Sequence, residues 1–367
     1  MNSPLKNILE EHCLKYPDLY HIYKMPYFFA QSKLRNSYSI NFKIRYNQFM
    51  NNEFIHNPQG FSGHSHASSI EEHNGQIYLS WYAYEEKEHT HGQIVISKFS
   101  KEIGDWTKGK FIFPDYDKAS CGNPVIFSFA GKLHIFFVVL RGGYWDKAQI
   151  YTSTMNDDES WTNPERVNTE AGIMVRHRPI INQDQATICA YDEKTMSTIL
   201  YKFSSNLKSW TKFSEFSGEY IQGDILQFSP KEWQMYLRAA GDNTHVMKAL
   251  SANGGATWEI ARDTPLLCPL SGIAAIKLSN DQILVCNNHT EQHKRNPLSL
   301  SLSSSKGVSF ELGPYHIDKS PIELSYPSLL QDSDGNIHIS YTYNRKMIKH
   351  ILISVEELTE RCKAENA

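Results

Sequence analysis

Short runs of alternating apolar and polar residues follow one another along most of the chain. Clear examples are NGQIYLSWYAY (74–84), AGKLHIFFVVL (130–140) and SNDQILVCNN (279–288). Each run has the length of a β-strand and is bounded by Gly, Asn, Asp or Ser. This pattern predicts an all-β protein built from hairpins.

Similar segments recur about every fifty residues. SKEIGDW, TMNDDESW, SSNLKSW, SANGGATW and SSSKGVSF end at Trp106, Trp161, Trp210, Trp258 and Phe310, in steps of 55, 49, 48 and 52 residues. A period of this size made of short strands is typical of a propeller. We expect six four-stranded blades over about residues 60–355, with residues 1–59 as an N-terminal extension that closes the propeller.

The residue types that recur in this segment have physical roles in a turn. Its best copy, SANGGATW (251–258), fits the Asp-box pattern S-x-D/N-x-G-x-x-W. Asn253 can cap its own turn, Gly255 permits a positive φ, and Trp258 can pack under the hairpin. These boxes are therefore expected to stabilise the fold rather than to act in catalysis.

Both ends of the chain have helical signals. Residues 1–25 are partly amphipathic, and SVEELTERCKAENA (354–367) predicts a short helix with Ser354 as its N-cap. Since no Pro/Gly/Ser-rich linker divides the chain, we predict one domain over residues 1–367.

Composition excludes several classes of function. The net charge is −3 and no basic stripe is present, which argues against a nucleic-acid partner. No run of 18 apolar residues predicts a transmembrane segment, and the N-terminus has no secretory h-region. Six dispersed cysteines indicate reduced thiols. We expect a cytoplasmic protein, free or peripheral to the inner membrane face, with its oligomeric state open.

No metal or other cofactor is expected. Five histidines crowd one region, at positions 64, 66, 73, 89 and 91, but their spacing is irregular and no HExxH or CxxC motif accompanies them. A histidine that acts as an acid or base is the better interpretation of this region.

Unusual polar residues precede the first strand of each predicted blade, where a propeller builds its centre. They are His64, His66, Asn123, Arg176, His177, Arg178, Gln222, Asp224, Ser271 and Tyr326. Arg178, Arg238 and Arg295 come from three blades at matched positions. Converging guanidinium groups repel one another unless an anion joins them, so they predict a site for a carboxylate.

The chain resembles the sialidase superfamily, in its bacterial BNR-repeat branch, over about residues 60–352. The segments that carry the resemblance are the Asp boxes, MYLRA followed by KALSANGGATW, VCNNHT followed by RNPLSLSLSS, and SYPSLLQDSDGNIHISYTYNRKMIKHI. The resemblance implies a six-bladed propeller, an arginine triad for the substrate carboxylate, a Tyr–Glu nucleophile pair and an acid/base carboxylate on a loop.

Several of these roles fall on matching residues. Arg238 and Arg295 match two triad arginines, and Tyr326 matches the nucleophile. A neutral phenol suits that role, because the sugar's own carboxylate would repel an anionic nucleophile. Glu88 is our choice for the acid/base group, with Glu86 and His89 as alternatives.

Other roles depart from the family pattern. His64 or His66 stands where the first arginine belongs, and Gln222 stands where the glutamate partner of the tyrosine belongs. Asp224 is two residues on, hence expected on the same strand face, and could replace that glutamate. His66 could take a leading catalytic role. Asn288 and His289 are expected to bind sugar hydroxyls, and Arg345 and Lys349 to form ion pairs at a blade edge.

The resemblance therefore implies an exo-glycosidase. Its partner would be an anionic sugar or glycoconjugate that ends in a carboxylate-bearing 2-keto-3-deoxy sugar, namely sialic acid, a related nonulosonate or Kdo. Two alternatives remain: a polysaccharide lyase with His66 and Tyr326 as base and acid, and a non-catalytic propeller that binds a glycan.

Overall fold

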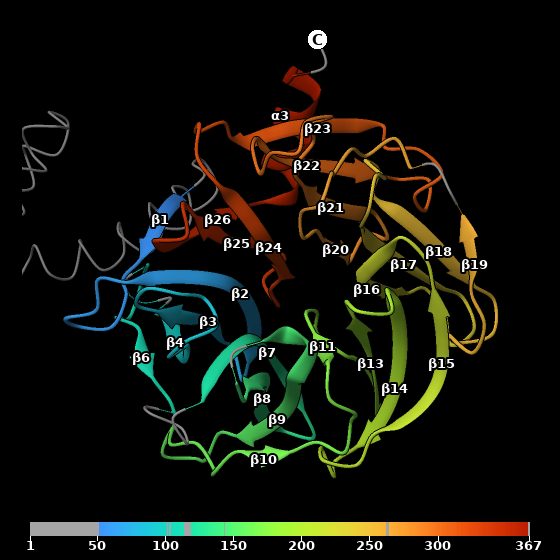
Figure 1. Cartoon of the computed structure of the whole chain (residues 1–367). Coiled ribbons are helices and arrows are strands. Elements are labelled where there is room, and N and C mark those ends of the chain that lie inside the picture. Colours follow the sequence, from blue (N-terminus) through green and yellow to red (C-terminus); the bar gives the residue numbers. More distant parts are fainter. Residues whose placement is uncertain are drawn as a thin grey trace, which may run out of the picture. The chain divides into compact units, whose positions relative to one another are not determined.

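The computed structural model describes residues 51–365, except 101, 103, 114–118, 143 and 262–263. Six antiparallel sheets surround a common centre (Figure 1), so the predicted six-bladed β-propeller is confirmed. These residues belong to a unit that runs from Met50 to Ala367. The helical segment predicted within residues 1–25 lies outside the described residues, and the single domain over residues 1–367 stays a prediction.

In each blade the first strand lies nearest the centre. The first blade contains β2 (His64–His73), β3 (Gln76–Tyr84), β4 (Gln93–Ser100), β5 (Asp105–Trp106) and β6 (Lys110–Phe111). The second contains β7 (Ser120–Phe129), β8 (Lys132–Leu140), β9 (Ala148–Thr154) and β10 (Glu165–Arg166). The third contains β11 (Ile173–Val175) and β12 (Ile180–Asn182), which both pair with β13 (Gln185–Asp192), and then β14 (Ser197–Ser204) and β15 (Thr211–Ser217).

The other three blades follow in chain order. The fourth contains β16 (Tyr220–Gln227), β17 (Trp233–Ala239), β18 (Met247–Ser251) and β19 (Glu259–Ala261). The fifth contains β20 (Ala274–Lys277), β21 (Ile283–Asn287), β22 (Leu298–Ser303) and β23 (Leu312–Asp318). The sixth contains β24 (Leu324–Gln331), β25 (Ile337–Tyr343), β26 (Met347–Ile353) and, as its fourth strand, β1 (Asn51–Ile55).

The sixth blade thus joins distant parts of the sequence. β1 pairs antiparallel with β26, from Asn51 opposite Leu352 to Ile55 opposite Ile348. The C-terminal helix α3 (Val355–Glu365) follows β26, and the Ser354 hydroxyl accepts a hydrogen bond from the Glu357 N–H at 3.1 Å. The predicted N-cap is therefore confirmed.

The Asp boxes lie at the turns between the third and fourth strands. In the best copy, Asn253 Oδ1 accepts the Thr257 N–H at 2.9 Å and Ser251 Oγ accepts the Gly255 N–H at 2.9 Å. The Trp258 indole donates to the Gly255 carbonyl at 3.0 Å, and Gly255 has φ of 83°. These bonds satisfy the turn locally, which explains why the repeat is visible in the sequence.

The innermost strands bond to their neighbours around the centre. Ser328 Oγ accepts the Ile70 N–H at 3.3 Å, and Ser69 Oγ accepts the Ile126 N–H at 3.1 Å. An inner strand has a free edge, so its N–H groups need such partners when they are buried. These side chains therefore tie neighbouring blades together at the axis.

Four innermost strands share a β-bulge near their start. The register of β2, β7, β16 and β24 shifts there, and each bulge has a non-glycine residue with positive φ. These residues are Ala67 (53°), Asn123 (44°), Gln222 (56°) and Tyr326 (52°). A bulge re-aims side chains, and three of these four residues are candidate site residues.

Candidate functional site

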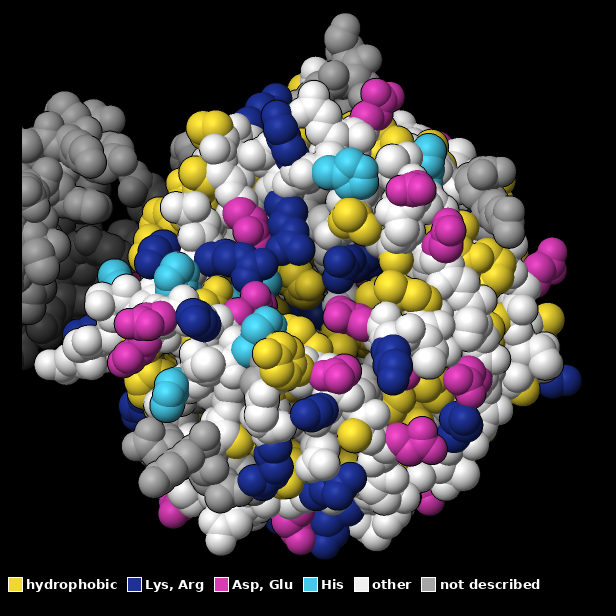
Figure 2. Space-filling view, viewed as in Figure 1, with side chains coloured by type: hydrophobic (Ala, Val, Ile, Leu, Met, Phe, Trp, Pro, Cys, Tyr) yellow, Lys and Arg dark blue, Asp and Glu magenta, His cyan; other side chains and the backbone are white. Residues whose placement is uncertain are grey.

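Polar side chains from all six blades meet at the centre, near the start of the innermost strands. In the space-filling view, Lys and Arg side chains gather around this centre with acidic and histidine side chains among them (Figure 2). This surface is the candidate functional site.

Tyr326 lies in the middle of the site. Its phenol oxygen accepts a hydrogen bond from Arg238 Nη1 at 3.3 Å, and the Arg295 guanidinium lies 5.5 Å from its ring centroid. Burial raises the pKa of the phenol, but the charges of Arg238 and Arg295 and a hydrogen bond from Gln222 outweigh it, so the pKa lies below its usual value. A Cβ atom at Gly272 would lie 3.3 Å from this ring, so glycine leaves room for it.

Gln222 fixes its neighbours through its amide. Its Oε1 atom accepts from Arg238 at 3.3 Å, and its Nε2 atom donates to the Tyr191 hydroxyl at 3.1 Å. Asn123 donates to the same hydroxyl at 3.1 Å. Gln222 and Asn123 therefore belong to one hydrogen-bond network at the site, and Tyr191 is a member that sequence reasoning missed.

His66 packs directly on the tyrosine. Its ring centroid is 4.6 Å from that of Tyr326 in an edge-to-face arrangement, the residue is only 2% exposed, and its Nδ1 atom has no hydrogen-bond partner. Burial, helped by the charges of Arg345 and Arg295, holds the pKa of His66 well below its usual value. His66 is therefore a neutral imidazole in the site.

Glu88 lies in the loop after β3, between two partners. It accepts a hydrogen bond from the Tyr82 hydroxyl at 2.5 Å and pairs with Arg345 Nη1 at 2.9 Å. Arg345 also donates through Nε to Glu323, which in turn accepts from Arg295 at 2.8 Å. The ion pair expected for Arg345 exists, but it joins the first and sixth blades beside the site.

Two further charged residues belong to the site, and neither was assigned a role there from the sequence. Glu193, in the turn after β13, has a pKa raised by burial, with Glu88 adding to the rise and Arg238 opposing it. Arg176 comes from the interruption between β11 and β12 and lies with its guanidinium 5.3 Å from the Tyr326 ring centroid. The sequence analysis placed Arg176 among the axial residues but chose Arg178, from the same segment VRHRPII, for the anion site.

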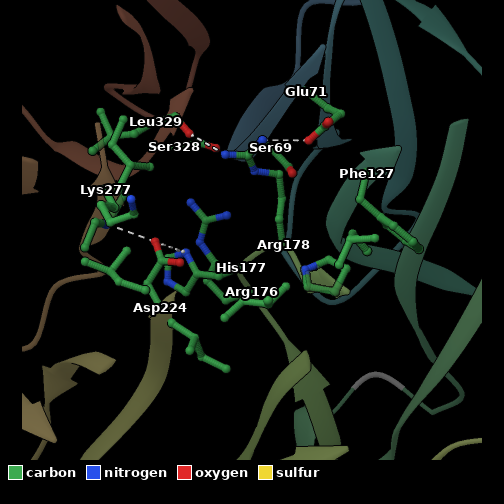
Figure 3. A pocket seen from close by; sticks show the side chains of 18 of the residues that line it. Ser69, Glu71, Phe127, Arg176, His177, Arg178, Asp224, Lys277, Ser328 and Leu329 are labelled. Carbon is green, nitrogen blue, oxygen red and sulfur yellow. Dashed lines mark hydrogen bonds and ion pairs between the residues drawn. The ribbon is translucent and has the colours of Figure 1, made fainter. Parts of the chain in front are cut away.

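Arg178 and Asp224 lie elsewhere. Arg178 pairs with Glu71 at 2.6 Å, and Asp224 contacts His177 Nδ1 at 3.1 Å and accepts the Ala275 N–H at 2.9 Å. Both line a pocket of about 310 Å³ further along the same innermost strands (Figure 3). Because the bulge at Gln222 breaks the two-residue alternation, Asp224 is not brought to Tyr326 as expected.

The remaining predicted residues have local roles. Asn288 is fully buried and bonds to Ser271 Oγ at 2.5 Å and to the carbonyls of Pro297 and Leu324 at 2.9 Å, so its amide does not face a substrate. His289 has a buried Nδ1 atom without a partner, and burial lowers its pKa. His64 stacks on Tyr84 with centroids 5.0 Å apart, at the edge of the site.

The described residues also bear on metal sites, disulfides and membrane-spanning helices. No group of His, Cys, Asp and Glu among them could hold a metal ion. Cys121, Cys189, Cys268 and Cys286 are buried and form no disulfide, as the predicted reduced thiols require. No helix of this part is long and apolar enough to cross a membrane.

Solved structures with the same fold include sialidases. A Hadza microbial sialidase superposes with a TM-score of 0.68 at 14% identity, over 80% of this chain and 66% of that one. NanB sialidase from Streptococcus pneumoniae gives 0.71 at 11% identity, over 82% and 70%. A protein of unknown function from Dyadobacter fermentans gives 0.64 at 16% identity, over 82% and 97%. These likenesses define a sialidase-like β-propeller.

The family follows from the sequence match. Residues 75–339 match the BNR repeat-like domain, and the chain belongs to this family, which confirms the predicted superfamily. No curated protein sequence matches the chain.

Proposed function

We propose that this protein is an exo-glycosidase that hydrolyses a terminal carboxylate-bearing 2-keto-3-deoxy sugar from a glycoconjugate. The observation that carries the proposal is the Tyr326 phenol oxygen, 3.3 Å from Arg238 and beside Arg295. In such a sugar the carboxylate is attached to the anomeric carbon itself. A cation that binds the carboxylate therefore brings the anomeric carbon to the phenol.

Arg238 is the best candidate for that cation. Its side-chain partners are neutral, namely Gln222 and Tyr326, and its buried Nε atom has no partner. Arg295 and Arg345 are already joined through Glu323. Among the described residues, no carboxylate pairs with Arg238, so a substrate carboxylate would complete its hydrogen bonds.

The proposed reaction has two steps. Tyr326 loses its phenol proton to water, and its oxygen then forms a bond to the anomeric carbon while the bond to the leaving oxygen breaks. Glu88 or Glu193 gives the leaving oxygen a proton. Water then adds to the anomeric carbon, its proton returns to the carboxylate, and the Tyr326 oxygen leaves. The substrate would be a glycoside of sialic acid, a related nonulosonate or Kdo.

His66 favours a second candidate, a lyase. It is neutral, buried against Tyr326 and has a free Nδ1 atom. In β-elimination on a uronate, such an imidazole removes the proton next to the carboxylate, Tyr326 protonates the leaving oxygen, and a C=C bond forms. Gln222 in place of a glutamate is no loss for this reaction.

One assay separates the candidates. The protein is incubated with α- and β-linked sialosides, related nonulosonates, Kdo glycosides and uronate oligosaccharides, and both free 2-keto-3-deoxy acid and the ultraviolet absorbance of unsaturated sugar are measured. Tyr326→Phe is the test variant, and Tyr144→Phe, at a residue that is 66% exposed, is its control.

Each outcome has a clear meaning. Release of free acid that is lost in Tyr326→Phe supports the hydrolase and names the sugar. An unsaturated product supports the lyase. Binding of a panel member without turnover, abolished by Arg238→Met, identifies a glycan-binding propeller and contradicts both enzyme proposals.

A further inference from the structure

Arg176 is a buried cation without an acidic partner. The residue is 2% exposed, and its guanidinium donates to three carbonyl oxygens, those of Ser68 (3.0 Å), Tyr326 (3.0 Å) and Pro327 (2.8 Å). No carboxylate lies within ion-pair distance of it in the described part of the chain. Removing an unpaired charge from water costs several kcal/mol. The burial of Arg176 therefore calls for a structural or functional explanation.

The three acceptors belong to two bulges. Ser68 follows Ala67 in the bulge of β2, and Tyr326 and Pro327 form the bulge of β24. Ala67 and Tyr326 have φ of 53° and 52°, which is unfavourable for residues with a side chain. Arg176 therefore holds together two strained backbone segments from the first and sixth blades.

Arg176 also faces the ring of the tyrosine. Its guanidinium carbon is 5.3 Å from the Tyr326 ring centroid, whereas Arg238 contacts the phenol oxygen at 3.3 Å. A phenolate spreads its negative charge over the oxygen and the ring. One cation at the oxygen and one over the ring would together neutralise that charge.

We propose that Arg176 positions Tyr326 and is the counter-charge of its phenolate. This inference rests on the proposed function for its catalytic consequence. Tyr326 then needs no carboxylate base, which accounts for an amide at position 222. The buried charge of Arg176 has no anionic partner in the resting site and gains one when Tyr326 ionises.

Other titratable and charged groups around Tyr326 act on the same phenol. They come from four blades and are His66, Tyr82, Tyr191, Glu193, Arg238 and Arg295. Glu193 opposes ionisation, whereas Arg238 and Arg295 favour it. A test of Arg176 must therefore leave these groups unchanged.

The test measures the tyrosine directly. The tyrosinate absorbance of each protein is titrated, and the curve of the matching Tyr326→Phe protein is subtracted. We expect Arg176→Met to move the Tyr326 midpoint upward by about one pH unit. Arg166→Met, on the outer strand β10, is the control and should leave the midpoint unchanged.

Arg176→Lys separates charge from position. Lysine keeps the positive charge but cannot donate to three carbonyl oxygens in the geometry of a guanidinium fork. We expect its Tyr326 midpoint to stay near that of the native protein, while kcat on the substrate found in the release assay falls about 10- to 100-fold.

The inference is overturned if folded Arg176→Met keeps the native Tyr326 midpoint. If the methionine variant does not fold, a folded Arg176→Lys protein with native kcat, or with a midpoint as high as that of free tyrosine, overturns it instead. The titration needs no substrate, so an inactive native protein would reject the proposed function and still allow this test.

Discussion

Gln222 shows how one side chain can set the chemistry of the site. A carboxylate at this position would lie beside Arg238 and Tyr326, and its charge would repel that of the phenolate. We predict that Gln222→Glu raises the pKa of Tyr326 and moves the pH–rate profile toward alkaline pH, with activity near neutral pH lowered about tenfold. Increased activity in this variant would show that the native site has lost a base.

Glu193 acts electrostatically on the same phenol. Its charge raises the pKa of Tyr326, and burial raises its own pKa. Replacing it with glutamine removes that charge, so the Tyr326 midpoint should fall by up to about one pH unit. Asp184→Asn, at an exposed turn, serves as the control in the same absorbance titration.

The raised pKa of Glu193 also leads to a prediction about the pH dependence of activity. If it is the group that protonates the leaving oxygen, activity of the native protein falls as pH rises through its raised pKa. Glu193→Gln should then remove this alkaline limb together with most of kcat, whereas Glu88→Gln should leave the limb in place. The reverse result would assign the proton to Glu88.

At the scale of elements, the Asp box is a local stabilising unit. Asn253 bonds the Thr257 N–H at 2.9 Å and the Thr257 hydroxyl at 2.8 Å. We predict that Asn253→Ala lowers the free energy of unfolding by about 1–2 kcal/mol, because these bonds and a third one, from the Ser251 hydroxyl, are lost. Val308→Ala, at a turn residue that is 82% exposed, should change it by less than about 0.5 kcal/mol.

Denaturant unfolding measures the predicted loss of stability, and the release assay tests whether activity is retained. Since the box lies at the periphery between β18 and β19, kcat should be unchanged in Asn253→Ala. A loss of activity without a loss of stability would contradict a purely structural role for the box.

Elements also explain what the sequence could and could not predict. The Asp boxes can be recognised in the sequence because each box makes the hydrogen bonds of its turn within eight residues. The β-bulges cannot be recognised in this way, because a bulge depends on the register between its strand and the neighbouring strand. Plain alternation places Gln222 and Asp224 on one face, but the bulge between them sends Asp224 to His177 and Ala275.

The same limit applies to the cations. The repeat correctly brought Arg238, near the end of β17, and Arg295, in the loop between β21 and β22, to the same centre as Tyr326. It selected Arg178 as the third cation, which was wrong, because Arg176 and Arg178 both come from the interruption between β11 and β12, where the repeat is irregular. Only the folded chain shows that Arg176 faces the tyrosine and that Arg178 pairs with Glu71.

At the scale of the whole molecule, the sixth blade depends on β1, and Glu53 on this strand is sensitive to pH. Burial and the nearby Asp105 raise the pKa of Glu53 from 4.5 to about 7. The folded protein therefore holds a proton that the unfolded chain releases. The resulting stability is complete below pH 4.5 and is lost as pH rises through about 7.

Glu53→Gln should abolish that dependence. We predict that it raises the free energy of unfolding near neutral pH by about 1–2 kcal/mol, a value discounted for the partial exposure of the side chain. Buried His350, whose pKa is lowered, acts with the opposite sign and destabilises the fold as pH falls below 6.5. Denaturant unfolding of the native protein and of Glu53→Gln at several pH values checks the prediction. The same pH dependence of the free energy of unfolding in both proteins would refute it.

The four bulges place Ala67, Asn123, Gln222 and Tyr326 at corresponding points of four blades. One backbone conformation thus accepts a methyl group, two amides and a phenol. Because the shape of each bulge does not depend on the chemistry of its side chain, new catalysts could be sought by randomising these four codons together. The scaffold would remain constant in such a library, and selection would act only on the groups around the axis.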